Sequence, residues 1–259
     1  MVLEACMIVI DNSEYMRNGD YPTSRYQAQL HTVELIFRRK TNANPESTVG
    51  LMTMAGESPR VVSNLTTEYG KVLSGLHQSR IEGQSKLVDG IQVACLALKN
   101  RQNKAQKQRV IVFVGSPITD SEADLDKLAK RLKKNGISID FINFGEQQIN
   151  TEKLERFISL ANSNDSSHLV TVPPGPNLLY EQVDRSALFQ EEGGASGGMG
   201  MGDEFGFDDP NMDPELALAI RLSLEEERAR QEREQAPAES NLEAVKEEPK
   251  GDDKMDESN

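Results

Sequence analysis

Two groups of residues in this sequence have types and spacing that could do chemistry. The first is Asp11-Asn12-Ser13, which directly follows the apolar run Met7–Ile10. Open α/β sheets bind ligands at the carboxyl ends of their strands, so an aspartate at this place suggests a metal-binding or catalytic role. The second is Leu216–Ser223, where apolar and small residues are spaced as on one side of a helix.

A catalytic role for Asp11 lacks the further groups that it would need. A phosphatase aspartate has a second acid two residues later, where this chain has Ser13, and a lysine near the phosphate, which we do not identify. The histidines His31, His77 and His168 fall in separate segments without metal or triad spacing, and we expect surface or helix positions for them. The sequence also shows no nucleophile elbow, phosphate loop or paired-carboxylate motif. We therefore predict that the protein is not an enzyme.

The C-terminal group is predicted to lie on a helix that begins at Asp213-Pro214, an N-cap followed by proline at the first helical position. Helical spacing continues to about Arg233. One stripe of this helix consists of Leu216, Ala219, Ile220 and Ser223, and Leu218 and Leu222 lie on the other side. A coiled coil would need three or more heptads, and packing back on the rest of the chain would favour a shorter tether. We expect this helix to bind a partner.

The charge of the chain is divided unevenly along its 259 residues. Residues 191–259 carry 21 acidic and 7 basic side chains, a net charge of −14, whereas residues 1–190 carry 21 acidic and 22 basic ones, a net charge of +1. Such a division is typical of a globular domain followed by a disordered, interacting extension. The predicted organisation is a globular domain at 1–190, a Gly-rich acidic linker at 191–211, the partner-binding helix at 212–233 and a disordered acidic tail at 234–259.

Composition also limits the partners and the compartment. The acidic extension and the evenly mixed N-terminal part argue against a nucleic-acid partner, which would require clustered basic residues. Cys6 and Cys95 lie in apolar runs without C-x-x-C spacing, so we expect buried thiols in a reducing compartment. Glu4 interrupts the N-terminus and the run Ala5–Ile10 is too short for a signal peptide, and no apolar stretch is long enough for a bilayer. These features predict a cytoplasmic and nuclear protein without a membrane partner.

Residues 1–190 alternate short β-branched runs with longer segments of helical spacing. The predicted strands are Met7–Ile10, Val49–Met54, Arg109–Val114, Ile137–Phe144 and Leu169–Val172. The predicted helices are Ser24–Arg39 with Ser24 as N-cap, Glu68–His77, Lys86–Leu98, Asp120–Lys134 with a stop at Gly136, and Thr151–Ala161. This order predicts an α/β fold with a doubly wound, mainly parallel sheet and helices on both faces.

Two details of the predicted sheet follow from its apolar patterns. The runs IVI and VIVFV do not alternate with polar residues, which is typical of central strands buried on both faces. The short, mixed segment Arg60–Ser63 is predicted to be an antiparallel edge strand, joined to the preceding strand by a hairpin through Gly56–Pro59.

The strand and helix order, together with Asp11-x-Ser13 after the first strand, resembles a von Willebrand factor A domain. In that family a D-x-S-x-S motif, a threonine from a later loop and an aspartate after the fourth strand hold Mg²⁺. This chain has Tyr15, Ser85 and Gly115-Ser116-Pro117 at the positions where the second serine, the threonine and the Thr-Asp pair are expected. Mg²⁺ needs several oxygen ligands with negative charge, so we predict no metal. Asp11 and Ser13 would then either satisfy amides of their own loop or contribute to a protein-docking surface.

The C-terminal helix resembles a ubiquitin-interacting motif. Its pattern, an acid, an apolar residue, alanine, serine and an acid, is matched by Glu215, Leu216, Ala219, Ser223 and Glu226. The resemblance implies that Leu216 and Ile220 bury apolar area on ubiquitin, while the small Ala219 lets the helix approach a nearly flat surface. The family usually has four consecutive acids before the leucine, and here those positions are Met212, Asp213, Pro214 and Glu215, so the acidic flank is weaker.

The combination of the two modules resembles the ubiquitin-receptor subunits of the proteasome regulatory particle. That resemblance implies a non-catalytic receptor whose first domain docks near the lid–base junction, with Asp11 and Ser13 at the docking surface, and whose helix binds ubiquitin and polyubiquitin chains. Implied partners are regulatory-particle subunits and ubiquitin-like shuttle proteins, without a cofactor. Two alternatives stay open: a ubiquitin adaptor of an endocytic or DNA-repair complex, and a metal-dependent adhesion domain.

Overall fold

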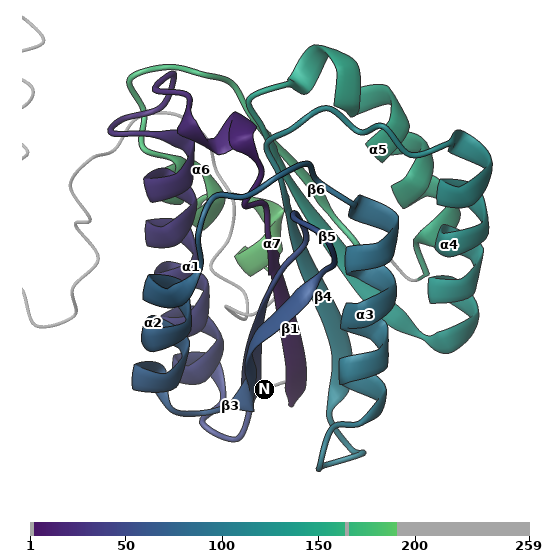
Figure 1. Ribbon diagram of the computed structural model, residues 1–259. Coiled ribbons are helices and arrows are strands. Elements are labelled where there is room, and N and C mark those ends of the chain that lie inside the picture. Colours follow the sequence, from purple (N-terminus) through teal and green to yellow (C-terminus); the bar gives the residue numbers. More distant parts are fainter. Residues whose placement is uncertain (1–2, 164–165, 191–259) are drawn as a thin grey trace, which may run out of the picture. The chain divides into compact units, whose positions relative to one another are not determined.

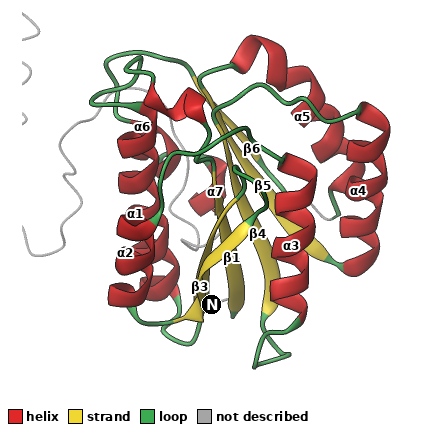
Figure 2. Cartoon of the chain, viewed as in Figure 1, coloured by secondary structure: helices red, strands yellow, loops and turns green. Residues whose placement is uncertain are grey.

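The computed structural model describes residues 3–163 and 166–190, which form one six-stranded sheet with helices on both of its faces (Figures 1 and 2). The strand order is β3-β2-β1-β4-β5-β6, and every neighbouring pair is parallel except the antiparallel β2–β3 pair. The strands are β1 (Glu4–Ile10), β2 (Thr48–Thr53), β3 (Arg60–Thr66), β4 (Lys107–Val114), β5 (Ile137–Phe144) and β6 (Leu169–Val172). The predicted fold class, an α/β von Willebrand A-type sheet, is confirmed.

The helices divide into two layers, one on each face of the sheet. They are η1 (Glu14–Arg17), α1 (Arg25–Ala43), α2 (Tyr69–Gln78), α3 (Leu87–Lys99), α4 (Glu122–Asn135), α5 (Gln147–Ala161), α6 (Leu179–Asp184) and α7 (Ala187–Gln190). Apolar residues of α3, α4 and α5 form one core cluster with the sheet, and those of α1, α2, α6 and α7 form another. Because both faces are covered, β1 is buried along its whole length, as its unbroken apolar run predicts.

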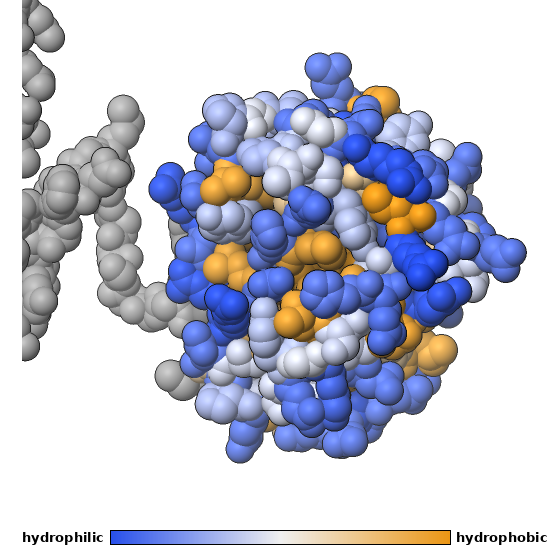
Figure 3. Space-filling view, turned by 60° about the vertical axis from the view of Figure 1, so that its left-hand side comes forward, coloured by the Kyte–Doolittle hydropathy of each residue, from blue (hydrophilic) through white to orange (hydrophobic). Residues whose placement is uncertain are grey.

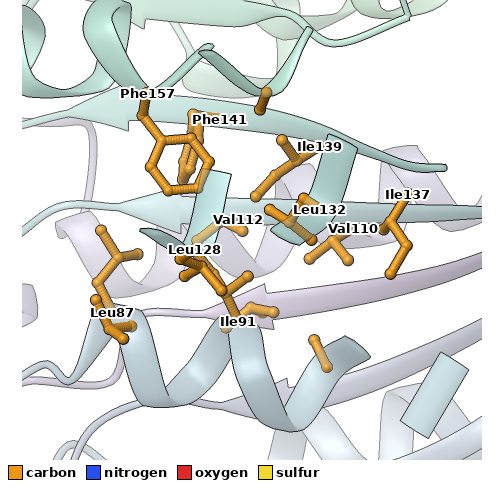
Figure 4. Packing of buried hydrophobic residues seen from close by; sticks show 14 of the residues in the cluster. Leu87, Ile91, Val110, Val112, Leu128, Leu132, Ile137, Ile139, Phe141 and Phe157 are labelled. Carbon is orange, nitrogen blue, oxygen red and sulfur yellow. The ribbon is translucent and has the colours of Figure 1, made fainter. Parts of the chain in front are cut away.

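The two cores are held by interlocking aromatic rings. On the α3–α5 side, Phe141 of β5 meets Phe157 of α5 edge-to-face at 5.2 Å between ring centroids, within the cluster that Figure 4 shows. On the opposite side Phe144 lies between Phe113 and Tyr21, at 6.2 and 5.7 Å. Such T-shaped contacts add to the free energy that each ring gains by leaving water. The outer surface is mixed, with apolar patches among hydrophilic residues on the face drawn in Figure 3.

The predicted strands agree closely with the structure, and β2 (Thr48–Thr53) lies one residue earlier than predicted. β5 and β6 have the predicted bounds, and β3 is the predicted antiparallel edge strand, extended to Thr66. β1 begins at Glu4 and β4 at Lys107, both earlier than predicted. Glu4 is charged but buried, and its ion pairs with Lys40 and Arg109 allow the strand to continue through it.

The helix predictions hold where local capping signals exist. The Ser24 side chain accepts a hydrogen bond from the Gln27 N–H at the start of α1, and Gly136 ends α4 in the left-handed conformation at φ 64°. α5 begins at Gln147, four residues before the predicted Thr151. η1, α6 and α7 were not predicted, because helices of four to six residues are too short to show an apolar period.

The two cysteines are free thiols in different surroundings. Cys6 on β1 is buried, and burial raises the pKa of its thiol to about 12. Cys95 on α3 is only half-buried, so the prediction of a buried thiol is wrong for this residue, although its pKa is also raised by burial, to about 11. Both thiols are thus protonated at neutral pH and poor nucleophiles.

A cluster of buried charges, which was not predicted from the sequence, lies at the amino end of the sheet. Arg109 Nη1 donates to Asp140 Oδ2 at 2.6 Å and its Nε donates to Glu4 Oε1 at 3.1 Å. Lys40 Nζ donates to Glu4 Oε2 at 2.8 Å. Two acids and two bases therefore neutralise one another inside the protein, which is the condition under which buried charge is tolerated.

Candidate docking site at the carboxyl edge of the sheet

The loop Asp11–Ser13 follows β1 at the carboxyl edge of the sheet, as predicted, and the aspartate is bonded to its surroundings through both oxygens. Asp11 Oδ1 accepts the Ser13 N–H at 2.9 Å. Asp11 Oδ2 accepts the Ser116 hydroxyl at 2.6 Å and the Gly115 N–H at 3.3 Å, both from the loop after β4. The carboxylate is therefore a junction between the loops that follow two central strands.

The backbone around Asp11 is held just as firmly. The Gln29 side chain, buried on α1, accepts the Asp11 N–H at 3.0 Å and donates to the Asp11 carbonyl at 2.9 Å. Asn12 accepts the Ala55 N–H at 2.9 Å and donates to the Arg80 carbonyl at 2.9 Å. The loop after β1 is thus tied to α1, to the loop after β2 and to the segment between α2 and α3.

Arg25 ties the other half of this edge together. Its guanidinium, almost wholly buried, donates to the Gly115 carbonyl at 2.8 Å, to both oxygens of Asp20 at 2.8 and 2.7 Å, and to Glu146 Oε1 at 3.2 Å. Gly145, at φ 89°, lets the guanidinium lie here, because a β-carbon would come within 2.5 Å of Arg25 Nη1. The ion pairs raise the pKa of Arg25 although burial opposes this, so the junction stays charged.

A further bridge joins the ends of β5 and β6. The Tyr21 hydroxyl donates to the Val172 carbonyl at 2.7 Å and accepts the Gly145 N–H at 3.0 Å. Buried Asn150 of α5 holds the loop after β4, because it accepts the Ile118 N–H at 3.0 Å and donates to the Ser116 carbonyl at 2.9 Å. The polar groups of this edge bond mainly to one another, although the buried Ser13 hydroxyl has no hydrogen-bond partner among the described residues.

The residues at this edge do not fit the Mg²⁺ site of the von Willebrand A family. Asp11 already uses both oxygens on protein donors, and Ser116 donates to it where the family supplies a second acid. Within residues 3–163 and 166–190, no three His, Cys, Asp or Glu side chains come close enough to hold a metal ion. Asp11 alone does not have enough charge to offset the cost of dehydrating Mg²⁺, and Asp20 and Glu146 at the same edge are paired with Arg25.

We expect chelation to leave the fold unchanged. Millimolar EDTA should shift the thermal unfolding midpoint of the whole chain by less than about 1 °C, because the Asp11 loop is held by protein donors. Added Mg²⁺ should likewise not raise the midpoint. Differential scanning calorimetry with and without EDTA checks this, and a clear fall in EDTA would show that a metal does stabilise the edge.

Comparison with known proteins identifies the fold and the family. Residues 6–118 match the von Willebrand factor type A domain family. The 26S proteasome regulatory subunit RPN10 of Saccharomyces cerevisiae is 54% identical over 241 residues, covering 88% of this chain and 89% of that one. The subunit rpn10 of Schizosaccharomyces pombe is 53% identical over 233 residues, covering 90% and 93%. The chain belongs to the Rpn10 family of 26S proteasome regulatory subunits.

A solved structure supports membership of the Rpn10 family at the level of the fold. The crystal structure of the SpRpn10 VWA domain is 53% identical and superposes with a TM-score of 0.69, covering 72% of this chain and 97% of that one. The resemblance predicted from the two modules is therefore confirmed. Within the described ranges, no helix is both long and apolar enough to cross a membrane.

The side chains predicted for docking do not lie at the surface of this Rpn10-family domain. Asp11 and Ser13 are both 0% exposed. The bonds of Asp11 agree with the other interpretation left open by the sequence, in which the residue satisfies amides of its own loop. The surface beside them belongs to η1, where Glu14 and Arg17 are exposed and Tyr15 is 44% exposed. A docking role for Asp11 would therefore be indirect, by fixing the position of this segment.

The remaining sequence-predicted residues have different outcomes. The ubiquitin-binding set, Glu215, Leu216, Ala219, Ile220, Ser223 and Glu226, lies outside the described residues, as do the predicted linker, helix and tail. His31 and His77 are exposed helix residues, as predicted. His168 is neither, because it precedes β6 and is half-buried with its ring nitrogen Nδ1 3.1 Å from Asp140 Oδ1. Only an unexplained charge within the apolar run of β5, Asp140, could have indicated this contact.

Proposed function

We propose that the chain is a non-catalytic ubiquitin receptor of the proteasome regulatory particle. Membership of the Rpn10 family, whose relatives are named as 26S proteasome regulatory subunits, supports the assignment to the particle. The ubiquitin-interacting pattern Glu215–Glu226 in the same chain is the observation that carries the receptor role. The hydrogen bond between Asp11 and Ser116 supports a scaffolding role for the first domain, since it joins two loops of the carboxyl edge.

In this proposal the helix binds ubiquitin weakly, and the first domain anchors the helix to the regulatory particle. A single helix of two to three turns buries less than a standard interface, so about −5 to −6 kcal/mol, a dissociation constant on the order of 100 µM, is expected. Capture of substrates then depends on avidity from polyubiquitin chains or from a second receptor on the same particle. A Gly-rich linker of this length would span about 25 Å on average.

The motif is tested by replacing its anchors together. Leu216→Asn, Ala219→Gln and Ser223→Asp in the whole chain should weaken binding of tetraubiquitin at least about tenfold, because the apolar contact is lost and a larger residue is forced between the helix and ubiquitin. Binding is measured by pull-down and by titration calorimetry. The control is Leu218→Asn, which helical spacing places on the opposite side. Undiminished binding by the triple variant would exclude this motif as the receptor site.

The first domain is proposed to dock on the particle near the lid–base junction. Asp11 and Ser13 contribute by holding the loop that carries η1, and the docked domain places the helix near incoming substrates. Subunits of the regulatory particle and ubiquitin-like shuttle proteins are the proposed partners, in the cytoplasm and the nucleus. Affinity purification of the tagged chain followed by mass spectrometry distinguishes this assignment from an endocytic or DNA-repair adaptor, whose subunits would be recovered in its place.

A further inference from the structure

A continuous groove runs between α3 and α4 on the outer surface of the domain. Its lower part is a hollow of about 600 Å³, and its upper part shares Gln92, Leu128 and Arg131 with it. The floor includes Leu128, Leu132 and Ile137, which Figure 4 shows in the apolar cluster beneath. On its rim Leu96 is 59% exposed. The floor residues themselves are at most 5% exposed, so the apolar surface that water reaches here belongs largely to Leu96 and to the half-buried Val93 and Cys95.

The two walls of the groove repeat the same spacing. The lining residues include Val88, Gln92, Cys95 and Lys99 of α3 and Asp124, Leu128, Arg131 and Asn135 of α4, and they also include Asp89, Val93, Leu96, Lys127 and Leu132. The first two sets each advance by four, three and four residues, as residues along one side of an α-helix do, so each forms a stripe along its helix. Two adjacent helices with matching stripes form a groove between them. The side chains of a third helix can pack into this groove, as they do in a helical bundle.

The charges along the groove specify what kind of helix fits. In its lower part the exposed cations Lys99 and Arg131 form no ion pair within residues 3–163 and 166–190, and no Asp or Glu is among the described residues that line that part. The upper part is different, because Asp89, Asp120 and Asp124 line it and Lys127 pairs there with Asp124 at 3.1 Å. Unmatched positive charge is therefore confined to the lower part of the groove. An acidic partner would supply the missing carboxylates.

Ordinary properties of helices account for single features of this groove and not for their combination. Basic residues near the C-terminus of a helix interact favourably with its dipole, which explains a positive end of α4 in general. One exposed leucine on a helix is also ordinary. Neither property explains why the apolar floor, the exposed Leu96 and the unpaired cations of two different helices lie along one groove with matching stripes.

We propose that the α3–α4 groove binds an amphipathic helix of another regulatory-particle subunit, one with an apolar stripe and with acidic residues that face Lys99 and Arg131. The proposal rests on the proposed function for the identity of the particle. The apolar stripe covers Leu96, Cys95 and Leu128, and the acids pair with the cations at the lower end. The groove thereby becomes a docking surface distinct from the buried Asp11 junction.

Binding of the whole chain to regulatory particles purified from cells that lack it tests this proposal. Leu96→Asp should raise the dissociation constant about tenfold, because it places a charge in the apolar contact. Arg131→Glu should raise it about fivefold and more at low salt, because it repels the acidic side of the partner helix. Both positions are exposed, so thermal unfolding midpoints should stay within about 2 °C of the parent.

Two control variants carry the same changes elsewhere. Ile149→Asp places a charge on α5 at a position that is 52% exposed, and Lys133→Glu reverses a charge on the side of α4 that faces away from the groove. Both should bind within about twofold of the parent. A 20-base-pair DNA duplex serves as a second probe, and the parent should not retain it at physiological salt.

Each outcome decides a different point. Weaker particle binding by the two groove variants, with unchanged controls, supports the groove as a docking surface. Binding equal to the parent overturns the groove and leaves the proposed function intact. If the parent itself does not bind the particles, the proposed function fails, and the groove assignment with it. DNA binding that Arg131→Glu abolishes and Leu96→Asp does not change would assign the cations to nucleic acid and overturn the helix proposal.

Discussion

Asp11→Arg should unfold or strongly destabilise the first domain, with a loss of at least about 3 kcal/mol in the free energy of unfolding. Asp11 is completely buried, and its oxygens accept hydrogen bonds from Ser13, Gly115 and Ser116. Arginine is larger, has no acceptor and would place an unpaired positive charge among donors. Urea denaturation of the whole chain, followed by near-ultraviolet circular dichroism, measures the loss.

The same substitution should reduce association with proteasome particles, because it destabilises the first domain. If Asp11 acts by holding the loop that carries η1, then association and stability should fall together. Asp11→Asn is the informative companion, because it retains the shape and one acceptor oxygen and should cost about 1–2 kcal/mol. Glu14→Arg changes an exposed residue of η1 itself. It should leave the free energy of unfolding within about 0.5 kcal/mol of that of the parent. A stable Asp11→Arg variant would mean that the loop reorganises without its carboxylate.

The place of Asp11 was predictable from the sequence, whereas its environment was not. A carboxylate after an apolar strand was expected at the carboxyl edge, and it lies there. Its partner Ser116 is 105 residues away, and from the sequence that serine was interpreted only as a poor replacement for a metal ligand. Whether two loops bond to each other or present their side chains to a partner depends on distances of a few ångströms. The apolar period of a sequence does not reveal such distances.

The elements themselves were predictable because their signals are local. The runs in β1 and β4 showed burial on both faces, and Ser24 and Gly136 marked the ends of two helices. The ubiquitin-interacting pattern is equally local, which is why the sequence predicts it although it lies outside the described residues. Charges inside apolar strands were the overlooked signal, since a buried Arg109 or Asp140 implies a buried partner somewhere else in the chain.

The groove between α3 and α4 was missed for a related reason. Each helix taken alone has an ordinary apolar side and an ordinary polar side. The match between the two stripes appears only when the sheet places the helices next to each other. The N-terminal part is evenly mixed in its composition, whereas Lys99 and Arg131 come together in space from separate helices.

Arg109→Met should destabilise the domain by about 3–5 kcal/mol at pH 7, because it leaves buried carboxylates without their cation. The matched control is Arg156→Met, where the arginine is 52% exposed and pairs with two carboxylates at the surface. That change should cost less than about 1 kcal/mol. Both side chains are arginines in two-carboxylate pairs, so the comparison isolates the effect of burial. Equal losses for the two variants would show that water reaches the cluster of Glu4, Lys40, Arg109 and Asp140.

The dependence on pH separates lost charge pairing from lost packing. Burial alone would raise the pKa of Asp140 and of Glu4. For Asp140, His168 and Arg109 outweigh burial and lower the pKa; for Glu4, Arg109 and Lys40 do so. A carboxylate with a lowered pKa in the folded state contributes stability above its ordinary pKa and loses it as the pH falls through the folded value. The parent should therefore lose stability from this cluster only in acid, below about pH 4.

In Arg109→Met the dependence on pH should change. Without the guanidinium, burial is opposed at Asp140 mainly by His168, and the pKa of Asp140 should rise above its value in the parent. The variant then takes up its proton at a higher pH than the parent does, so its disadvantage becomes smaller as the pH falls. The difference between parent and variant, measured by urea denaturation at several pH values, should be largest near pH 7 and should shrink in acid. A difference that is the same at every pH would mean that Arg109 stabilises the domain by filling space and not by neutralising Asp140.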